Sequence, residues 1–190
     1  MAGELKLGGS TVATHTGSGA SAVVTIDNGV KFPTGHIIGH VFDSNRTTLN
    51  ITGTYATNAT PTSSGGGEIF SVPYTCKKST SKLLFHITPW IQESSNHSDK
   101  IACALFRDST FLAVQFISCT GYPAAEGHMG YVTTIMQVDA IDENSHNYNV
   151  RVGADGGTLE HFPSSASYWA STYYNSLVVG STFELFEISN

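Results

Sequence analysis

Residues 100–117, KIACALFRDSTFLAVQFI, indicate the fold class of this chain. Two runs of apolar and β-branched residues, 100–107 and 111–117, flank the short polar turn Asp108-Ser109-Thr110. Two strand-like runs joined by so short a turn are typical of an antiparallel β-hairpin. We therefore expect an antiparallel sheet in the middle of the chain.

Strand-like segments recur on both sides of this hairpin at intervals of ten to fifteen residues. No stretch keeps a period of 3.6 over three turns, so little helix is expected. Short strands separated by turns predict an all-β fold, an antiparallel β-sandwich of jelly-roll-like form over residues 36–190. The polar stretch 58–67, NATPTSSGGG, is expected to be an exposed loop. The remaining predicted strands are 37–42, 47–55, 68–75, 82–92, 130–138, 148–152 and 176–188.

Residues 1–35 differ from the rest of the chain and predict an extended N-terminal arm. Their β-like runs, 10–14 and 22–26, are broken by glycine pairs and a proline, and each is too short to form a core. Such a segment is ordered by pairing with a neighbouring subunit or a larger assembly. The apolar side chains expected to anchor the arm are those of Leu5, Leu7, Val12, Val24 and Ile26.

The charge content excludes some partners and favours others. Charged residues make up 13% of the chain, against about 25% in an average globular protein. The net charge is −6 and the longest basic run is Lys77-Lys78, so a nucleic-acid partner is not expected. Interface cores are depleted of Lys, Glu and Asp, so the low charge favours a surface covered by copies of the same chain. No apolar run approaches the roughly 20 residues of a membrane span, and membrane insertion is not expected.

The cysteines and the nucleophile motifs point away from catalysis. Cys76, Cys103 and Cys119 are odd in number and far apart, which favours neither a disulfide framework nor a zinc site. They are expected to be small buried residues. The sequence contains no Gly-x-Ser-x-Gly elbow and no cysteine in a catalytic context, so no enzyme and no cofactor are expected.

The histidines predict no metal site within one chain. His36 and His40 would share a strand face at a separation of roughly 13 Å, at about 3.3 Å per residue, too far apart for one ion. The favoured interpretation is that they lie at an edge or an interface. An alternative is that His86 or His128 meets its copies on a threefold axis and binds an ion there.

A cluster of carboxylates follows the predicted strand 130–138. Asp139, Asp142 and Glu143 precede Asn144 and His146 in a polar stretch. An acidic turn between strands is the favoured interpretation. Paired carboxylates could also suit glycoside hydrolysis, and acidic loops can hold calcium, although the alternating Asp register of a calcium loop is absent here.

Aromatic residues are concentrated late in the chain. Tyr168, Trp169, Tyr173 and Tyr174 are interspersed with Ser, Ala and Thr, a composition typical of adaptable binding surfaces. These four residues are the candidates for a receptor or glycan site. The alternative is a long insertion that packs on its own domain or on a neighbouring subunit.

Five segments, in order along the chain, carry a resemblance: LKLGGSTVATH (5–15), FPTGHII (32–38), TSKLLFHI (80–87), ACALFRD (102–108) and STFELFEI (181–188). Together they resemble tailed-bacteriophage structural proteins, particularly those of aquatic, cyanophage-like type. The resemblance implies a trimeric β-sandwich on the virion surface, as a head decoration (cement) protein or a tail-fibre tip, with no catalytic residues. The stretches 58–67 and 146–174 do not follow the pattern of that family, which leaves binding specificity open.

Together these features predict a non-enzymatic structural protein of a phage virion. We expect homotrimers on the particle surface, anchored to the major capsid or a tail protein through residues 1–35. The opening residues lack a signal-peptide pattern, so assembly is expected in the host cytoplasm. One alternative is a tail-fibre module that binds a host receptor or surface glycan, and another is a cellular trimeric jelly-roll protein of the cytokine-like or complement-like kind.

Overall fold

The computed structural model describes residues 3–7, 10–16, 23–26, 34–56, 58–95, 100–118, 129–131, 133–161 and 180–190. All regular structure in these residues is β-strand, and the predicted all-β, antiparallel sandwich is confirmed. The chain divides into two compact units, Met1–His36 and Ile37–Asn190. None of the described segments is a helix long and apolar enough to cross a membrane.

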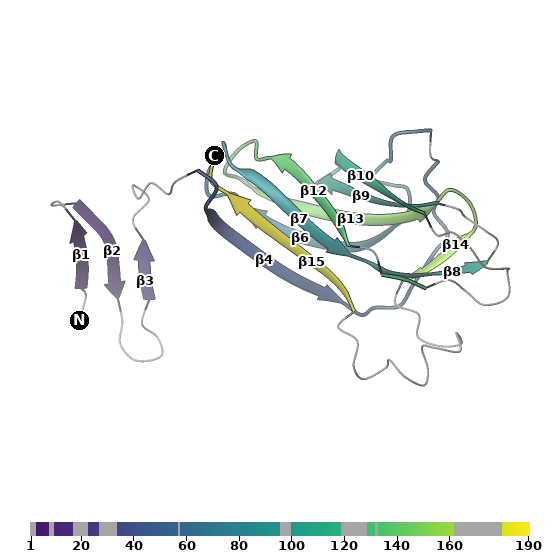
Figure 1. The fold of residues 1–190 in the computed structure, drawn as a ribbon, viewed down its shortest axis with the longest axis horizontal. Helices are drawn as coiled ribbons and strands as arrows, with labels where there is room; N and C mark the ends of the chain where they lie inside the picture. The colour runs from purple at the N-terminus through teal and green to yellow at the C-terminus, as the bar shows by residue number, and fades with distance from the viewer. Residues whose placement is uncertain are drawn as a thin grey trace. The chain divides into compact units, whose positions relative to one another are not determined.

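The first unit is a three-stranded antiparallel sheet in the order β1-β2-β3 (Figure 1). Its strands are β1 (Gly3–Leu7), β2 (Ser10–Thr16) and β3 (Val23–Ile26). The short β-like runs expected in the arm therefore pair with one another through their backbones. Leu5 lies in β1 with 58% of its surface exposed, Leu7 ends that strand, Val12 lies in β2, and Val24 and Ile26 lie in β3.

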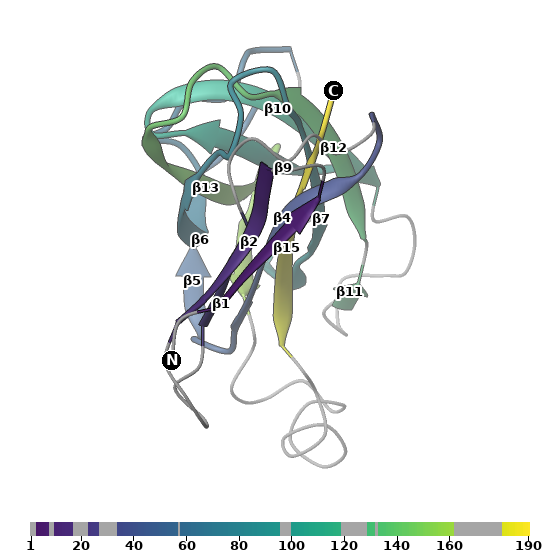
Figure 2. The same ribbon diagram turned by 90° about the vertical axis from the view of Figure 1, so that its left-hand side faces the viewer.

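The second unit is the sandwich. One layer is the sheet β10-β9-β13-β6, and the other contains the sheet β12-β7-β15-β4 (Figures 1 and 2). The strands of the first sheet are β6 (Gly67–Thr75), β9 (Lys100–Arg107), β10 (Thr110–Ser118) and β13 (Ser145–Ala154). Those of the second are β4 (Ile37–Asn45), β7 (Lys82–Thr88), β12 (Thr134–Asp139) and β15 (Ser181–Ile188).

A third small sheet, β11-β8-β14-β5, lies at one end of the sandwich. Its strands are β5 (Leu49–Ile51), β8 (Trp90–Ser95), β11 (Met129–Tyr131) and β14 (Thr158–His161). Two predicted strands are divided between this sheet and its neighbour. The segment 82–92 is interrupted at Pro89, which cannot donate to a sheet ladder, and 130–138 becomes β11 and β12.

The hairpin predicted over residues 100–117 is present. β9 pairs with β10 in antiparallel register, with Arg107 opposite Thr110 and a turn at Asp108 and Ser109. Asp108 has a φ of 54°, a left-handed conformation that Asp tolerates better than most residues. β9 also pairs with β13 on its other side, so the hairpin continues into the wider sheet.

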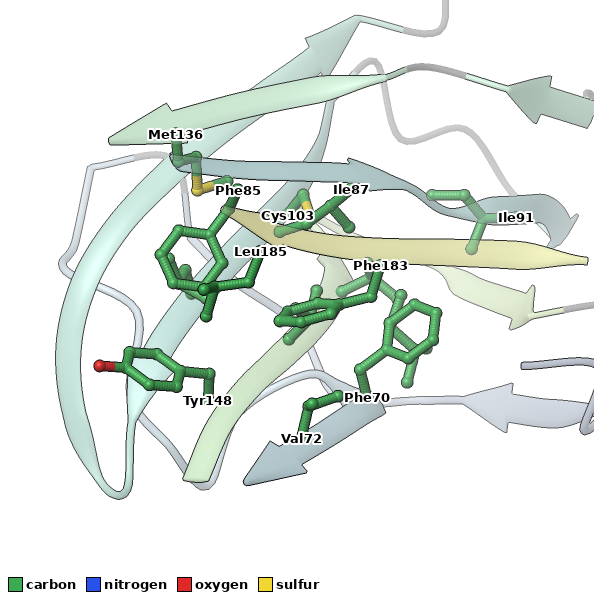
Figure 3. Packing of buried hydrophobic residues seen from close by; sticks show 14 of the residues in the cluster. Phe70, Val72, Phe85, Ile87, Ile91, Cys103, Met136, Tyr148, Phe183 and Leu185 are labelled. Carbon is green, nitrogen blue, oxygen red and sulfur yellow. The ribbon is translucent and has the colours of Figure 1, made fainter. Parts of the chain in front are cut away.

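The core lies between the two layers and follows the two-residue period of the strands. β7 contributes Leu83, Phe85 and Ile87, and β15 contributes Phe183 and Leu185, all of them fully buried (Figure 3). They pack in one cluster with residues of the opposite sheet: Phe70, Val72, Cys103, Leu105, Tyr148, Val150 and Val152. Cys76 and Cys103 are free and buried, as expected, whereas Cys119 lies outside the described residues.

Candidate functional site

The outer surface of the sheet β12-β7-β15-β4 is an exposed apolar face made of two cross-strand rows. The strand registers place Ile135, His86, Glu184 and Phe42 side by side in the first row. The second row is Gln137, Leu84, Phe186 and His40. Residues two apart on a strand point to the same side, so both rows face away from the core. We call these residues the open face.

Large apolar side chains on the open face are in contact with solvent. Ile135 is 59% exposed and Phe42 is 52% exposed, while Leu84 and Phe186 between them are half-buried. Ile37, at the start of β4 in the same sheet, is 60% exposed. Of the large apolar side chains found exposed in the described residues, half belong to this sheet. Several exposed or half-buried apolar side chains on one sheet surface are typical of an interaction site.

Two histidines and a glutamate lie close to one another on the open face. The His40 ring stacks on Phe186 with centroids 4.6 Å apart, and the His86 ring meets Phe186 edge-on at 5.4 Å. His40 Nε2 is 3.8 Å from one Glu184 carboxylate oxygen and His86 Nδ1 is 3.9 Å from the other. These separations are too long for hydrogen bonds. Glu184 therefore lies between two imidazoles with its hydrogen-bonding capacity available to a further group.

The outer surface of the opposite sheet is covered by the chain itself. Phe106, Ala102 and Ala104 of β9 are buried there beneath Tyr55, with Phe111 and Val114 packed alongside. β9 is therefore buried on both of its faces.

The cover is held in place at both ends by hydrogen bonds. Tyr55 N donates to Ala154 O at 2.9 Å, and the Tyr55 hydroxyl donates to Gly65 O at 2.9 Å. Arg151 Nε donates to Gly65 O at 2.7 Å and its Nη2 to Gly66 O at 3.2 Å. The predicted loop 58–67 is thus fixed to the sheet, although Asn58, Ala59 and Thr60 are exposed as expected.

The acidic turn predicted around Asp142 forms a bridge with the central hairpin. His146 Nδ1 is 2.7 Å from a carboxylate oxygen of Asp108, and His146 Nε2 is 3.0 Å from one of Asp142. Hydrogen bonds to Asp108 and then to Asp142 raise the pKa of His146, since both ring nitrogens donate when it is charged. The pKa of Asp108 is lowered chiefly by its hydrogen bond from His146. The bridge ties the β9–β10 turn to the start of β13.

The other acidic residues of this turn also have partners within the chain. Lys82 pairs with Asp139, and the backbone N–H of Ser79 donates to Glu143 at 3.3 Å. Among the described residues, no cluster of three His, Cys, Asp or Glu side chains is arranged to hold a metal ion. These contacts favour the structural interpretation of the turn. His128, the other candidate for an ion on a threefold axis, lies outside the described residues.

Glu187 is a buried carboxylate that the sequence analysis did not identify. It accepts hydrogen bonds from the Tyr74 hydroxyl at 2.8 Å and from the backbone N–H groups of Lys77 and Lys78 at 2.8 and 3.0 Å. Burial and then the neighbouring Glu187 raise the pKa of Tyr74. Gly39 makes this possible, because a Cβ at that position would overlap the Tyr74 hydroxyl oxygen. The carboxylate links β15 to β6 and to the turn after it.

His161 forms a second buried polar link. Its Nδ1 is 2.8 Å from Thr47 O and its Nε2 is 2.7 Å from Ser181 Oγ, which also accepts from Trp90 N at 2.7 Å. Thr47 O can only accept, so Nδ1 carries the proton and Nε2 accepts from the serine hydroxyl. Burial lowers the pKa of His161, which keeps it neutral. Ser181 and His161 are both fully buried and join β8, β14 and β15.

The aromatic residues predicted to bind a receptor or glycan, Tyr168, Trp169, Tyr173 and Tyr174, lie outside the described residues. The described part of the chain therefore offers the open face as the candidate site. The open face presents apolar and imidazole side chains side by side, which suits contact with another molecule.

Comparisons with known proteins assign the chain to no family. No family model matches it, and no curated protein matches its sequence. Among solved structures, it is similar to the dimeric latent PorU of Porphyromonas gingivalis (8% identity, TM-score 0.34, 89% of this chain and 17% of PorU covered). It is also similar to the structure of the infectious bursal disease virus Gx strain (8% identity, TM-score 0.35, 91% of this chain and 41% of that protein covered). A third similar structure is that of T=1 particles derived from infectious bursal virus (9% identity, TM-score 0.33, 91% of this chain and 40% of that protein covered). The chain spans less than half the length of each of these proteins.

Proposed function

We propose that this chain is a non-enzymatic structural protein of a tailed-phage virion, which forms homotrimers on the particle surface. The observation that carries the proposal is the open face, where Phe42 and Ile135 are more than half exposed. Exposed apolar side chains on one sheet surface of a protein with few charges suit a chain that functions as an assembly. The ordered sequence resemblance to phage structural proteins supports the virion as the place of that assembly.

The first unit is proposed as the anchor to the particle. Its small sheet has β1 and β3 at its edges and an exposed Leu5. Edge strands can pair with a strand of another chain through backbone hydrogen bonds, a common mode of attachment. The partner would be the major capsid protein or a tail protein. A subunit that binds only the assembled particle stabilises that particle through linkage.

A receptor- or glycan-binding role at a fibre tip is the alternative. The composition around Tyr168 and Trp169 favours it, because Tyr and Ser side chains give adaptable contacts at low entropic cost. In a trimer, three weak sites would act together through multivalency. Binding to a glycan array that is lost on replacing Tyr168, Trp169 and Tyr173 with Ala would support this role over a purely structural one.

The trimer is tested by the mass of the protein in solution, measured by light scattering on the full chain and on a chain lacking residues 1–35. We expect about three times 20.2 kDa for the full chain, and a trimer also for the shortened chain, because the open face belongs to the second unit. A monomeric full chain at every concentration would contradict the proposal.

A further inference from the structure

We propose that copies of this chain associate with one another through the open face. The inference rests on the proposed trimer and deepens it, because it names the surface by which the subunits meet. Its occupants are the other copies of the same chain, whose open faces converge with the first on the threefold axis of the trimer. Leu84 and Phe186 would form the apolar centre of this contact, with Ile135 and Phe42 at its margins.

The chain covers the opposite outer surface of the sandwich with its own residues. There the apolar residues around Phe106 are covered by Tyr55, and Tyr55 is fixed by hydrogen bonds to Ala154 and Gly65. The chain thus supplies a cover for one outer surface of the sandwich. On the open face the side chains of Ile135 and Phe42 remain in solvent. Burial of these side chains against another copy would remove their apolar surface from water, which favours association.

The charges of the open face favour another copy of the chain as its partner. Each copy carries a net charge of −6, so two copies repel unless they meet through surfaces without excess charge. The open face carries one formal charge, Glu184, with His40 and His86 on either side of it. At the margin of the same sheet Lys82 pairs with Asp139. A strongly acidic or basic partner would find no complementary patch here.

A second copy presents the complementary groups. Around a threefold axis the same residues of every copy come together, so the imidazoles of one copy can approach Glu184 of the next. The carboxylate has no hydrogen-bond partner among the two imidazoles of its own chain, because both lie at 3.8 Å or more. A donor from a neighbouring subunit would provide that partner. The face is thus complementary to itself in both charge and apolar content.

The test replaces the two most exposed residues of the open face. The variant Phe42→Lys/Ile135→Lys places a charge at each end of the first row without removing any core side chain, since both residues are more than half exposed. The matched control is Ile141→Lys, because Ile141 is 55% exposed but lies in the turn after β12, outside the two rows of the open face. All variants are compared by light scattering at equal concentration, and by circular dichroism to check that they fold.

We expect the wild-type protein and the Ile141→Lys variant to have about three times the mass of one chain, 20.2 kDa, and the double variant to have the mass of one chain. If the lysine variant does not fold, the milder Phe42→Ser/Ile135→Ser variant is measured in its place, with at least a tenfold weaker association expected. An unchanged trimer in the folded double variant would overturn the inference and leave the trimer itself intact. A monomeric wild-type protein would overturn both.

Discussion

The two outer surfaces of the sandwich differ in how their apolar side chains are kept from water. On the sheet β10-β9-β13-β6, Phe106 is 1% exposed because Tyr55 lies over it. On the sheet β12-β7-β15-β4, Ile135 is 59% exposed. A single chain thus covers one surface with its own segment and presents the other. The difference supports the proposal that the second surface contacts other copies of the chain.

The largest effect is expected from removing the cover. Tyr55→Ala deletes the ring over the Phe106 cluster and the hydrogen bond to Gly65 O, so we expect the free energy of unfolding to fall by about 3–5 kcal/mol. Its counterpart on the open face, Phe42→Ala, is expected to cost less than about 1 kcal/mol in dilute solution, where the subunits are separate. Urea denaturation measures both. Equal costs would remove the distinction between the two surfaces.

A second effect compares the inner and outer sides of one strand. Glu187→Ala leaves the Tyr74 hydroxyl and two backbone N–H groups without their acceptor, and we expect a loss of about 2–4 kcal/mol in the free energy of unfolding. The matched variant is Glu184→Ala, three residues earlier on β15 and facing outward. It is expected to change the stability of the monomer by about 0.5 kcal/mol or less. Similar losses for the two variants in urea would contradict the assignment of Glu187 as the structural carboxylate.

A third and smaller effect concerns the attachment of the covering segment. Arg151→Ala removes the donors to Gly65 O and Gly66 O, so we expect about 1–2 kcal/mol of lost stability. Faster amide hydrogen exchange is expected in residues 62–67, with no change in β7. Exchange that stays as slow as in the wild-type protein would show that Tyr55 alone holds the cover.

The smallest effect is a change with pH. The folded pKa of His146 is raised above its ordinary value near 6.5. Its stabilising effect is therefore complete below pH 6.5 and is lost as the pH rises through the folded pKa. We expect the urea midpoints of the wild-type protein and a His146→Gln variant to differ most near pH 6 and to converge at higher pH. A difference that grows with pH would contradict the bridge to Asp108 and Asp142.

Much of the fold could be predicted from local patterns. The two apolar runs in residues 100–117 and the turn between them indicated the hairpin, and short strand-like runs separated by turns indicated most of the other strands. β1 and β14, of five and four residues, were missed. The two-residue period of a strand could have located Glu187, which shares its side of β15 with Phe183 and Leu185.

The open face and the histidine bridge could not be predicted in this way. The bridge joins Asp108 to His146, 38 residues away, and depends on β13 pairing with β9, which no local pattern encodes. Similarly, Ile135 and Phe42 lie on β12 and β4, strands that are separated in the sequence and share one face only because β7 and β15 pair between them. Which outer surface Tyr55 covers is likewise a matter of tertiary packing.

The central claim is that the open face becomes buried when subunits meet. Hydroxyl-radical footprinting of the unmodified protein, at a concentration where it is assembled and after dilution to separate subunits, measures this for each side chain. We predict that Phe42, Ile135, Leu84 and Phe186 are protected in the assembled sample, while Ile141 is modified equally in both. Equal modification of the open face in the two samples, with assembly confirmed by mass, would contradict the burial of this face between subunits.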